Sequence, residues 1–554
     1  YIGKYMGAER TKGGGVAEYG WWVDTDTLLP TNEQAADFAG TFRHELGHAL
    51  GINLLTEDTV IYGETYSRMN RWMTSKETWQ THLMDQEGKM AKPGMVIAKS
   101  SKLPEGYSKK DVFLVDEDIT NDGKGYAYFV GDNVREVLDG ATFFGRSAVP
   151  VKGWGSSGFD GSHLQTAGMM SHRPYSNYTT SLEVELAVMQ DIGFGIDRRA
   201  YFGRSVYGNG LTINNTNGYF ARNSDGTAYL ANTYSAVPLG VGLHIYGSNN
   251  TVTQSANILT RGTGAAGVRV DGMGNTLIIP ENTEIHADGY RGNGIIIAYG
   301  SGQTVNQAGT VTASGRGGTG IRFDFGSSSN GADDEYRGSY IRYKRSVNAT
   351  SGAITEVKNL DITDMKVNQY NAAPNELNGV MVENYNLSGT LVGGENAIYI
   401  AKNAFVKNIN VNEGASIRGN ITSDWKQFGD DACEGSYDKG NKPLRIQYGE
   451  NNLGENGYEY SLYIPDLVTH LNFNTGMTYT GNITGEDNMK IFVNNGTLNY
   501  GGTADVVSVE VGKNAKLYGG KYTLSFIEDD DIPDEFEDDT TGKLINHGTI
   551  APTS

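Results

Sequence analysis

The chain has 554 residues, a formal net charge of −20 and a single cysteine. This length can hold two or more domains, the acidity argues against nucleic acid or an anionic membrane as partner, and one cysteine excludes an internal disulfide framework. Glycine is abundant, with 75 residues, whereas proline contributes only 12. A glycine-rich, proline-poor sequence with many Asn, Thr, Val and Ile favours closely turned β structure over disorder.

The first expected element is a helix over residues 33–50. Apolar residues recur there at steps of four, which is the pattern of an amphipathic helix with one core-facing side. The residues of that face are Phe38, Phe42, Leu46 and Leu50. Gly51 is a suitable C-terminal stop. The same spacing predicts a second helix over residues 181–192.

The first helix contains the motif His44-Glu45-x-x-His48. Residues four apart lie on one face of a helix, so both imidazoles can bind one cation. Histidine ligands suit zinc, and a catalytic zinc takes three protein ligands and a water molecule. We therefore expect Zn²⁺ as the cofactor. Glu45 is expected to be the general base that takes a proton from the attacking water.

The third ligand has to come from elsewhere in the chain. The metzincin pattern H-E-x-x-H-x-x-G-x-x-H has its glycine at Gly51, but Leu54 stands where that pattern has its last histidine. The residue types alone leave the third ligand open among several downstream side chains. These are Glu57, Asp58, Glu64, His82, His163 and His172.

The stretch "GSHLQTAGMMSHRPYSNYTTSLEVELAVMQDIGFGID", residues 161–197, resembles the leishmanolysin-like metzincins. In that family a long insertion follows the glycine, and the third histidine comes shortly before a methionine turn and a closing helix. The resemblance implies that His163 is the third zinc ligand. It also implies that Met170 forms the methionine turn, with Met169 as its competitor.

This resemblance covers about residues 30–197 and implies a zincin-like α+β catalytic domain over residues 1–199. Only 43 residues precede His44, so the domain is expected to lack part of its N-terminal lobe. The spacing also departs from the family's. His163 follows His48 by 115 residues, which is longer than the family leads us to expect.

From about residue 205 the sequence changes to short β segments separated by Gly and Asn, and it repeats. The segments "GLHIYG", "GVRVDG", "GIIIAYG" and "GIRFDFG" begin at Gly242, Gly267, Gly294 and Gly320, at steps of 25, 27 and 26 residues. Further β segments lie between them, so each repeat holds three short strands. Such a repeat is typical of a β-solenoid, whose coils stack at about 4.8 Å around a continuous apolar core. We predict a parallel β-helix over residues 200–554.

A hydrolase domain followed by such a solenoid resembles the passenger of a Gram-negative autotransporter, on the evidence of residues 240–326. The resemblance implies a right-handed β-helix stalk that is displayed at the cell surface, on the outer membrane, or secreted. It implies membrane contact only through a C-terminal barrel, which is absent from this chain. The acidic run 528–539 is expected to loop out of the solenoid. We expect a monomer.

Together these expectations predict a zinc metalloendopeptidase that hydrolyses extracellular proteins or peptides. The alternative is a non-catalytic β-helix adhesin with a degenerate protease domain. A carbohydrate-active β-helix is disfavoured, because that chemistry needs Asp, Lys and Arg clustered on one strand face and the solenoid sequence shows only scattered ones. These are Arg269, Asp271, Arg322 and Asp324.

Overall fold

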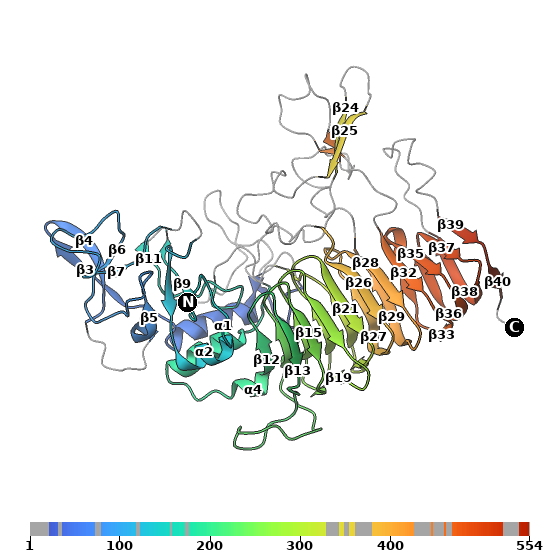
Figure 1. The fold of residues 1–554 in the computed structure, drawn as a ribbon, viewed down its shortest axis with the longest axis horizontal. Helices are drawn as coiled ribbons and strands as arrows, with labels where there is room; N and C mark the ends of the chain where they lie inside the picture. Colours follow the sequence, from blue (N-terminus) through green and yellow to red (C-terminus); the bar gives the residue numbers. More distant parts are fainter. Residues whose placement is uncertain are drawn as a thin grey trace. The chain divides into compact units, whose positions relative to one another are not determined.

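The computed structural model describes residues 21–31, 36–71, 79–117, 122–155, 158–171, 177–327, 343–347, 354–359, 379–425, 445–446, 459–460, 468–524 and 542–552. These residues form two compact units (Figure 1). The first contains the residues up to Asn209 together with Ser327, and the second contains those from Gly210 onwards. No helix in the described ranges is long and apolar enough to cross a membrane.

The first unit combines helices with short strands. Its helices are α1 (Phe38–Ala49), η1 (Trp79–His82), α2 (Asp132–Leu138), α3 (Glu183–Asp191) and α4 (Arg198–Tyr201). Its strands are β1 (Trp21–Trp22), β2 (Ala36–Asp37), β3 (Thr56–Ile61), β4 (Glu64–Met69), β5 (Leu83–Met84), β6 (Ile97–Ala98), β7 (Phe113–Leu114), β8 (Tyr126–Phe129), β9 (Val149–Lys152), β10 (Trp154–Gly155), β11 (Gly158–Phe159) and β12 (Phe202–Val206).

Most strands of the first unit pair antiparallel. β3 and β4 form a hairpin, β5, β8 and β9 form a three-stranded sheet, and β10 pairs with β11. β1 with β2 and β6 with β7 are short parallel pairs. The sheet edge at β9 and the β10–β11 pair support the loop that follows residue 159.

Helix α1 begins later than the spacing predicts, with Asp37 as its N-cap, and it ends before Gly51, whose φ of 122° only glycine adopts readily. The predicted core face is wrong. Its residues Phe42, Leu46 and Leu50 are 49%, 42% and 39% exposed. The helix instead buries Ala39 and Gly40, and Gly47 lets the side chain of Met170 approach the helix closely. The second predicted helix corresponds to α3.

The second unit consists mainly of stacked parallel strands, as the repeat predicts. One stack contains β14 (Val241–Ile245), β17 (Ala266–Val270), β20 (Asn293–Ile297) and β23 (Thr319–Phe323). Another contains β13 (Thr212–Asn215), β15 (Thr251–Gln254), β18 (Thr276–Ile279), β21 (Gln303–Gln307), β26 (Val382–Leu387), β28 (Val406–Val411), β32 (Thr469–Phe473), β35 (Met489–Val493), β37 (Ser508–Val511) and β39 (Lys543–Asn546). A third contains β16 (Ile258–Thr260), β19 (Glu284–Ala287) and β22 (Thr310–Ala313).

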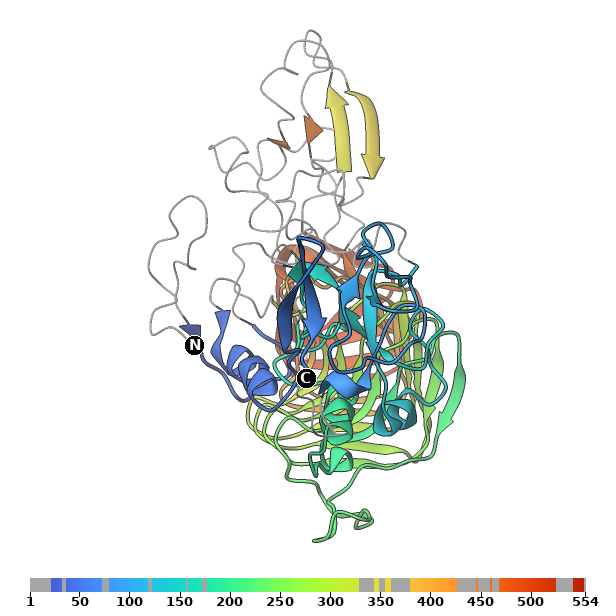
Figure 2. The same ribbon diagram turned by 90° about the vertical axis from the view of Figure 1, so that its left-hand side faces the viewer.

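Further strands of 2 to 11 residues continue the first and third stacks towards the C-terminus. These are β27 (Thr390–Ile400), β29 (Ser416–Ser423), β33 (Met477–Tyr479), β34 (Ile483–Thr484), β36 (Gly496–Val506), β38 (Ala515–Leu524) and β40 (Thr549–Ala551), with the short helix η5 (Glu486–Asn488) before β35. A separate antiparallel sheet contains β24 (Tyr343–Val347), β25 (Ile354–Asn359), β30 (Arg445–Ile446) and β31 (Glu459–Tyr460). Figure 2 shows β24 and β25 as two arrows of opposite direction.

The register of the stacks explains the repeat. Val241 pairs with Ala266, Ala266 with Asn293, and Asn293 with Thr319, so each repeat in the sequence is one coil. The same strands also align four apolar side chains that are fully buried: Leu243, Val268, Ile295 and Ile321. The long parallel sheets around a continuous apolar core are those of a solenoid and are consistent with a β-helix.

Candidate metal centre

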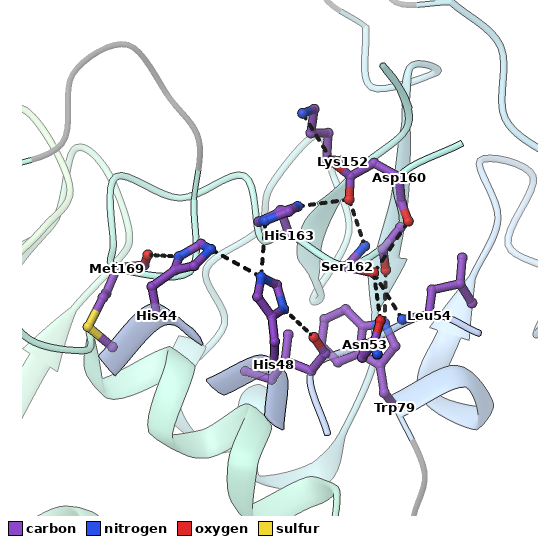
Figure 3. Close-up of polar contacts among 12 residues, drawn as sticks. His44, His48, Asn53, Leu54, Trp79, Lys152, Asp160, Ser162, His163 and Met169 are labelled. Carbon is purple, nitrogen blue, oxygen red and sulfur yellow. Dashed lines mark hydrogen bonds and ion pairs between the residues drawn. The ribbon is translucent and has the colours of Figure 1, made fainter. Parts of the chain in front are cut away.

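Three histidine side chains converge in the first unit (Figure 3). Nε2 of His48 lies 3.1 Å from Nε2 of His44 and 3.2 Å from Nε2 of His163. The ligand nitrogens of all three residues lie within 4.8 Å of one another. Nitrogens that share a tetrahedral zinc at 2.0–2.1 Å are about 3.3 Å apart. The three imidazoles are therefore close enough to share one cation.

Two distant chain segments produce this convergence. Helix α1 presents His44 and His48 one turn apart, and the loop after β11 presents His163. The backbone around His163 is fixed on both sides: Lys152 N–H donates to the carbonyl of His163 at 2.8 Å, and Leu164 N–H donates to that of Met170 at 2.8 Å. The third histidine is thus part of an ordered extension of the β9 sheet edge.

Leu54, which stands where the common metzincin pattern has its histidine, has a structural role instead. Its backbone N–H donates to Oγ of Ser162 at 3.0 Å, and its side chain is buried. Ser162 is the neighbour of His163. The chain segment that leaves α1 is thereby bonded to the loop that carries the third histidine.

Each ring nitrogen that faces away from the cluster has a hydrogen-bond partner. Nδ1 of His44 lies 2.7 Å from the carbonyl oxygen of Met169, and Nδ1 of His48 lies 2.7 Å from that of Ile52. A carbonyl oxygen accepts only, so Nδ1 must carry the proton and Nε2 presents its lone pair to the cluster. The two helix histidines are held in the tautomer that binds a metal through Nε2.

The electrostatics of the centre favour neutral imidazole. Burial lowers the pKa of His44 below its ordinary value of 6.5, and the neighbouring His48 and His163 lower it further. Three nitrogen donors without a carboxylate suit zinc and the later transition metals, whereas calcium and magnesium require oxygen ligands. The donor set therefore fits Zn²⁺.

Both methionines of the predicted turn lie beside α1, in different roles. The side chain of Met170 is buried against Gly47, where an added Cβ would overlap its Sδ. Met169 contributes its carbonyl to His44. Met170 thus packs its sulfur against α1 at Gly47, which lies between His44 and His48 in the sequence.

The turn is organised by a buried carboxylate that the sequence did not reveal. Glu185 of α3 accepts hydrogen bonds from the backbone N–H groups of Met170 at 2.8 Å, Met169 at 3.2 Å and Leu182 at 2.8 Å. Burial raises the pKa of Glu185 to about 7, in spite of these donors. A glutamate inside an apolar helix was the available signal, but its partners lie on another segment.

Asp160 is a second residue that pattern analysis missed. Its Oδ1 lies 2.8 Å from Nδ1 of His163, and its Oδ2 lies 3.1 Å from Nζ of Lys152. Burial alone would raise the pKa of Asp160, but the hydrogen bonds from His163, Ser162 and Lys152 hold it well below its usual range. The signal in the sequence was a carboxylate three residues before the histidine.

The remaining candidate residues lie outside the cluster. His82 stacks on Phe129, and its Nδ1 lies 2.8 Å from the carbonyl oxygen of Val130. Glu57, Asp58 and Glu64 lie on the β3–β4 hairpin, where Glu57 pairs with Arg68 and Glu64 with Lys102. Among the described residues, the three histidines form the one group that could hold a metal.

Glu45 lies on α1 directly after His44, and its side chain is exposed. His172 lies outside the described residues, as do Cys433 and the acidic run 528–539.

Comparison of the chain with protein-family models, with curated proteins and with solved structures finds no significant match. The function of the centre therefore has to be argued from its own geometry and chemistry.

Proposed function

We propose that the protein is a zinc-dependent endopeptidase of the metzincin type. The observation that carries the proposal is the convergence of the Nε2 atoms of His44, His48 and His163 on one point. Three histidine ligands would leave a zinc ion with one position for water, which is the ligand number of a catalytic rather than a structural zinc.

The chemistry is shared between the cation and Glu45. A bound zinc would lower the pKa of a water molecule to about 7 and polarise the carbonyl of the substrate. Glu45 then accepts the proton of the water that attacks the carbonyl, and donates it to the departing amine. The side chain of Glu45 is exposed and therefore accessible to solvent, as this role requires.

The solenoid supports a proposal about where the peptidase acts. We infer a right-handed β-helix of the autotransporter passenger type, which displays the peptidase at the surface of a Gram-negative bacterium or accompanies it on secretion. The substrate class is extracellular proteins or peptides. An acidic protein with a net charge of −20 suits this exposed location and disfavours nucleic acid.

The proposal is tested by metal content and by cleavage of casein or gelatin. Wild-type protein is expected to bind one zinc and to cleave. The Glu45→Gln variant should retain zinc and lose cleavage by about 10²–10⁴-fold, because the general base is gone but the ligands remain. His163→Ala should lose zinc, since two histidines hold the cation far more weakly than three.

His82→Ala is the matched control, because it removes a histidine of the same unit that lies outside the cluster. Cleavage by Glu45→Gln at the wild-type rate would show that Glu45 is not the base. Wild-type protein that binds no zinc and cleaves nothing would favour the adhesin alternative instead.

A further inference from the structure

The three histidines of the metal centre are oriented in two different ways. His44 and His48 place Nδ1 against backbone carbonyls, which carry no net charge and which no substitution removes. His163 places Nδ1 against the carboxylate of Asp160, at 2.8 Å. Of these three Nδ1 contacts, that of His163 is made to a side chain, and that side chain is charged (Figure 3).

Asp160 is itself held firmly. Its backbone N–H donates to the carbonyl of Gly153 at 2.8 Å, and Ser162 N–H donates to its Oδ1 at 3.1 Å. Its other oxygen pairs with Lys152 at 3.1 Å, and the carboxylate is 17% exposed. These contacts join β9 to the loop after β11, so the carboxylate is fixed before any metal arrives.

The same geometry excludes Asp160 as a ligand. Its oxygens contact the far side of the His163 ring, Nδ1, while the cluster is formed by Nε2 atoms. The group of residues able to hold a metal contains the three histidines and not this aspartate. Its effect on a cation has to pass through His163.

We infer that Asp160 is a positioning residue of the metal centre, an inference that rests on the proposed function. The carboxylate accepts the Nδ1–H of His163, which fixes the tautomer with the lone pair on Nε2 and sets the angle of the ring. Its negative charge also makes Nε2 a better electron donor to the cation. Outer partners of this kind typically contribute 10- to 100-fold in metal affinity.

The inference is tested by zinc affinity, measured by competition with a chelating dye, and by the rate of zinc release. The Asp160→Asn variant keeps an oxygen that can accept from Nδ1 but has no charge, and its affinity should fall by roughly 10-fold. Asp160→Ala loses both the accepting oxygen and the charge, and its zinc affinity should fall by up to about 100-fold. The visible spectrum of the Co²⁺-substituted protein should change in Asp160→Ala, because the ring of His163 is no longer held.

Asp122→Asn is the control, because it removes the charge of an aspartate of the same unit that forms an exposed ion pair with Lys124. The melting temperature of each metal-free variant separates a loss of folding from a loss of metal affinity. Asp160→Asn in particular is expected to melt close to wild type without metal.

Zinc affinity, release rate and cobalt spectrum equal to wild type in both Asp160 variants would overturn the inference and leave the proposed function intact. If wild-type protein binds neither zinc nor cobalt, the proposed function fails and the inference fails with it. The wild-type titration therefore tells the two failures apart.

Discussion

Glu185 shows how much of the metal centre depends on one buried side chain. Its carboxylate is 1% exposed and accepts from three backbone N–H groups, two of them in the methionine turn. The carbonyl oxygen of Met169, which lies in that turn, accepts the Nδ1–H of His44 and so fixes the ring. A residue of α3 therefore determines where a predicted ligand of α1 points.

The Glu185→Gln substitution is expected to be severe although it preserves shape. Both carboxylate oxygens accept N–H groups, and the amide NH₂ that replaces one of them cannot accept a hydrogen bond. One or more buried N–H groups are left unsatisfied, at about 1–3 kcal/mol each. Unfolding by urea should show this loss, and zinc affinity should fall because Met169 moves.

Glu136→Gln provides the comparison, because Glu136 is 59% exposed and its partner Arg198 keeps a second carboxylate, that of Glu183, at 3.0 Å. A Glu185→Gln variant as stable as Glu136→Gln would contradict the role assigned to this carboxylate.

At the scale of single elements, helix α1 shows where sequence periodicity succeeds and where it misleads. The i, i+4 spacing correctly places His44 and His48 on adjacent turns. The apolar residues Phe42 and Leu46, which the same periodicity assigns to the core, are largely exposed. Periodicity detects that a helix has an apolar side, but it cannot say whether the rest of the protein covers that side.

The turns of the solenoid explain much of the glycine content. Gly289 and Gly315 occupy equivalent turns of successive coils, and neither needs a positive φ. A Cβ on Gly315 would overlap the carbonyl oxygen of Gly289 and lie 2.6 Å from its carbonyl carbon. Glycine is required here because backbones of adjacent coils approach each other too closely for any side chain.

Gly315→Ala is therefore expected to destabilise the second unit by about 1–3 kcal/mol, which is the usual cost of overpacking. The reason is that the new methyl group would clash with the backbone of Gly289, which cannot rotate away as a side chain can. Thermal unfolding followed by circular dichroism measures the effect. Gly501→Ala in the same unit should change stability by less than about 1 kcal/mol, because the nearest atom to its Cβ is the Thr480 methyl carbon at 3.3 Å. Equal melting temperatures for the two variants would contradict this account.

At the scale of the whole molecule, a protein without a disulfide framework depends on packing and on buried ion pairs. Arg269 and Asp271 were scattered charges in the sequence, but in the solenoid both are buried and paired. Nε of Arg269 lies 2.9 Å and Nε2 of His244 lies 3.0 Å from Oδ2 of Asp271. These charges are therefore paired with each other inside the coil.

The pH dependence of stability follows from this pair. Burial alone would raise the pKa of Asp271, but the charge of Arg269 and the hydrogen bond with His244 hold it well below 3.8. A carboxyl whose pKa is lower in the folded protein stabilises it fully above the unfolded value. The stabilisation is lost as the pH falls below about 4.

Asp271→Asn is expected to lose about 3–5 kcal/mol at pH 7, because it leaves Arg269 buried without its counter-ion. The difference from wild type should shrink as the pH falls below 4, because the carboxyl of Asp271 in the unfolded chain then binds a proton that the folded protein takes up only at lower pH. Urea unfolding at pH 7 and at pH 3 measures both quantities. A constant difference across this range would show that the charge of Asp271 is not the stabilising feature.

The sequence by itself determined the features that depend on local spacing. The four-residue step places His44 and His48 one helical turn apart, and the repeat of about 26 residues specifies stacked coils, because neighbouring strands must pair in register. Both patterns act within one helix or between successive coils. No knowledge of distant contacts is needed to recognise them.

Only the tertiary structure decided what lies against α1. His163 is 115 residues from His48. Asp160 meets the site through its side chain, whereas Leu54 with Ser162 and Glu185 meet it through hydrogen bonds to backbone N–H groups, which carry no residue signature. The resemblance to a family suggested His163, but spacing alone left six candidates. The physical reason is that closing a long loop depends on the packing of everything between its ends.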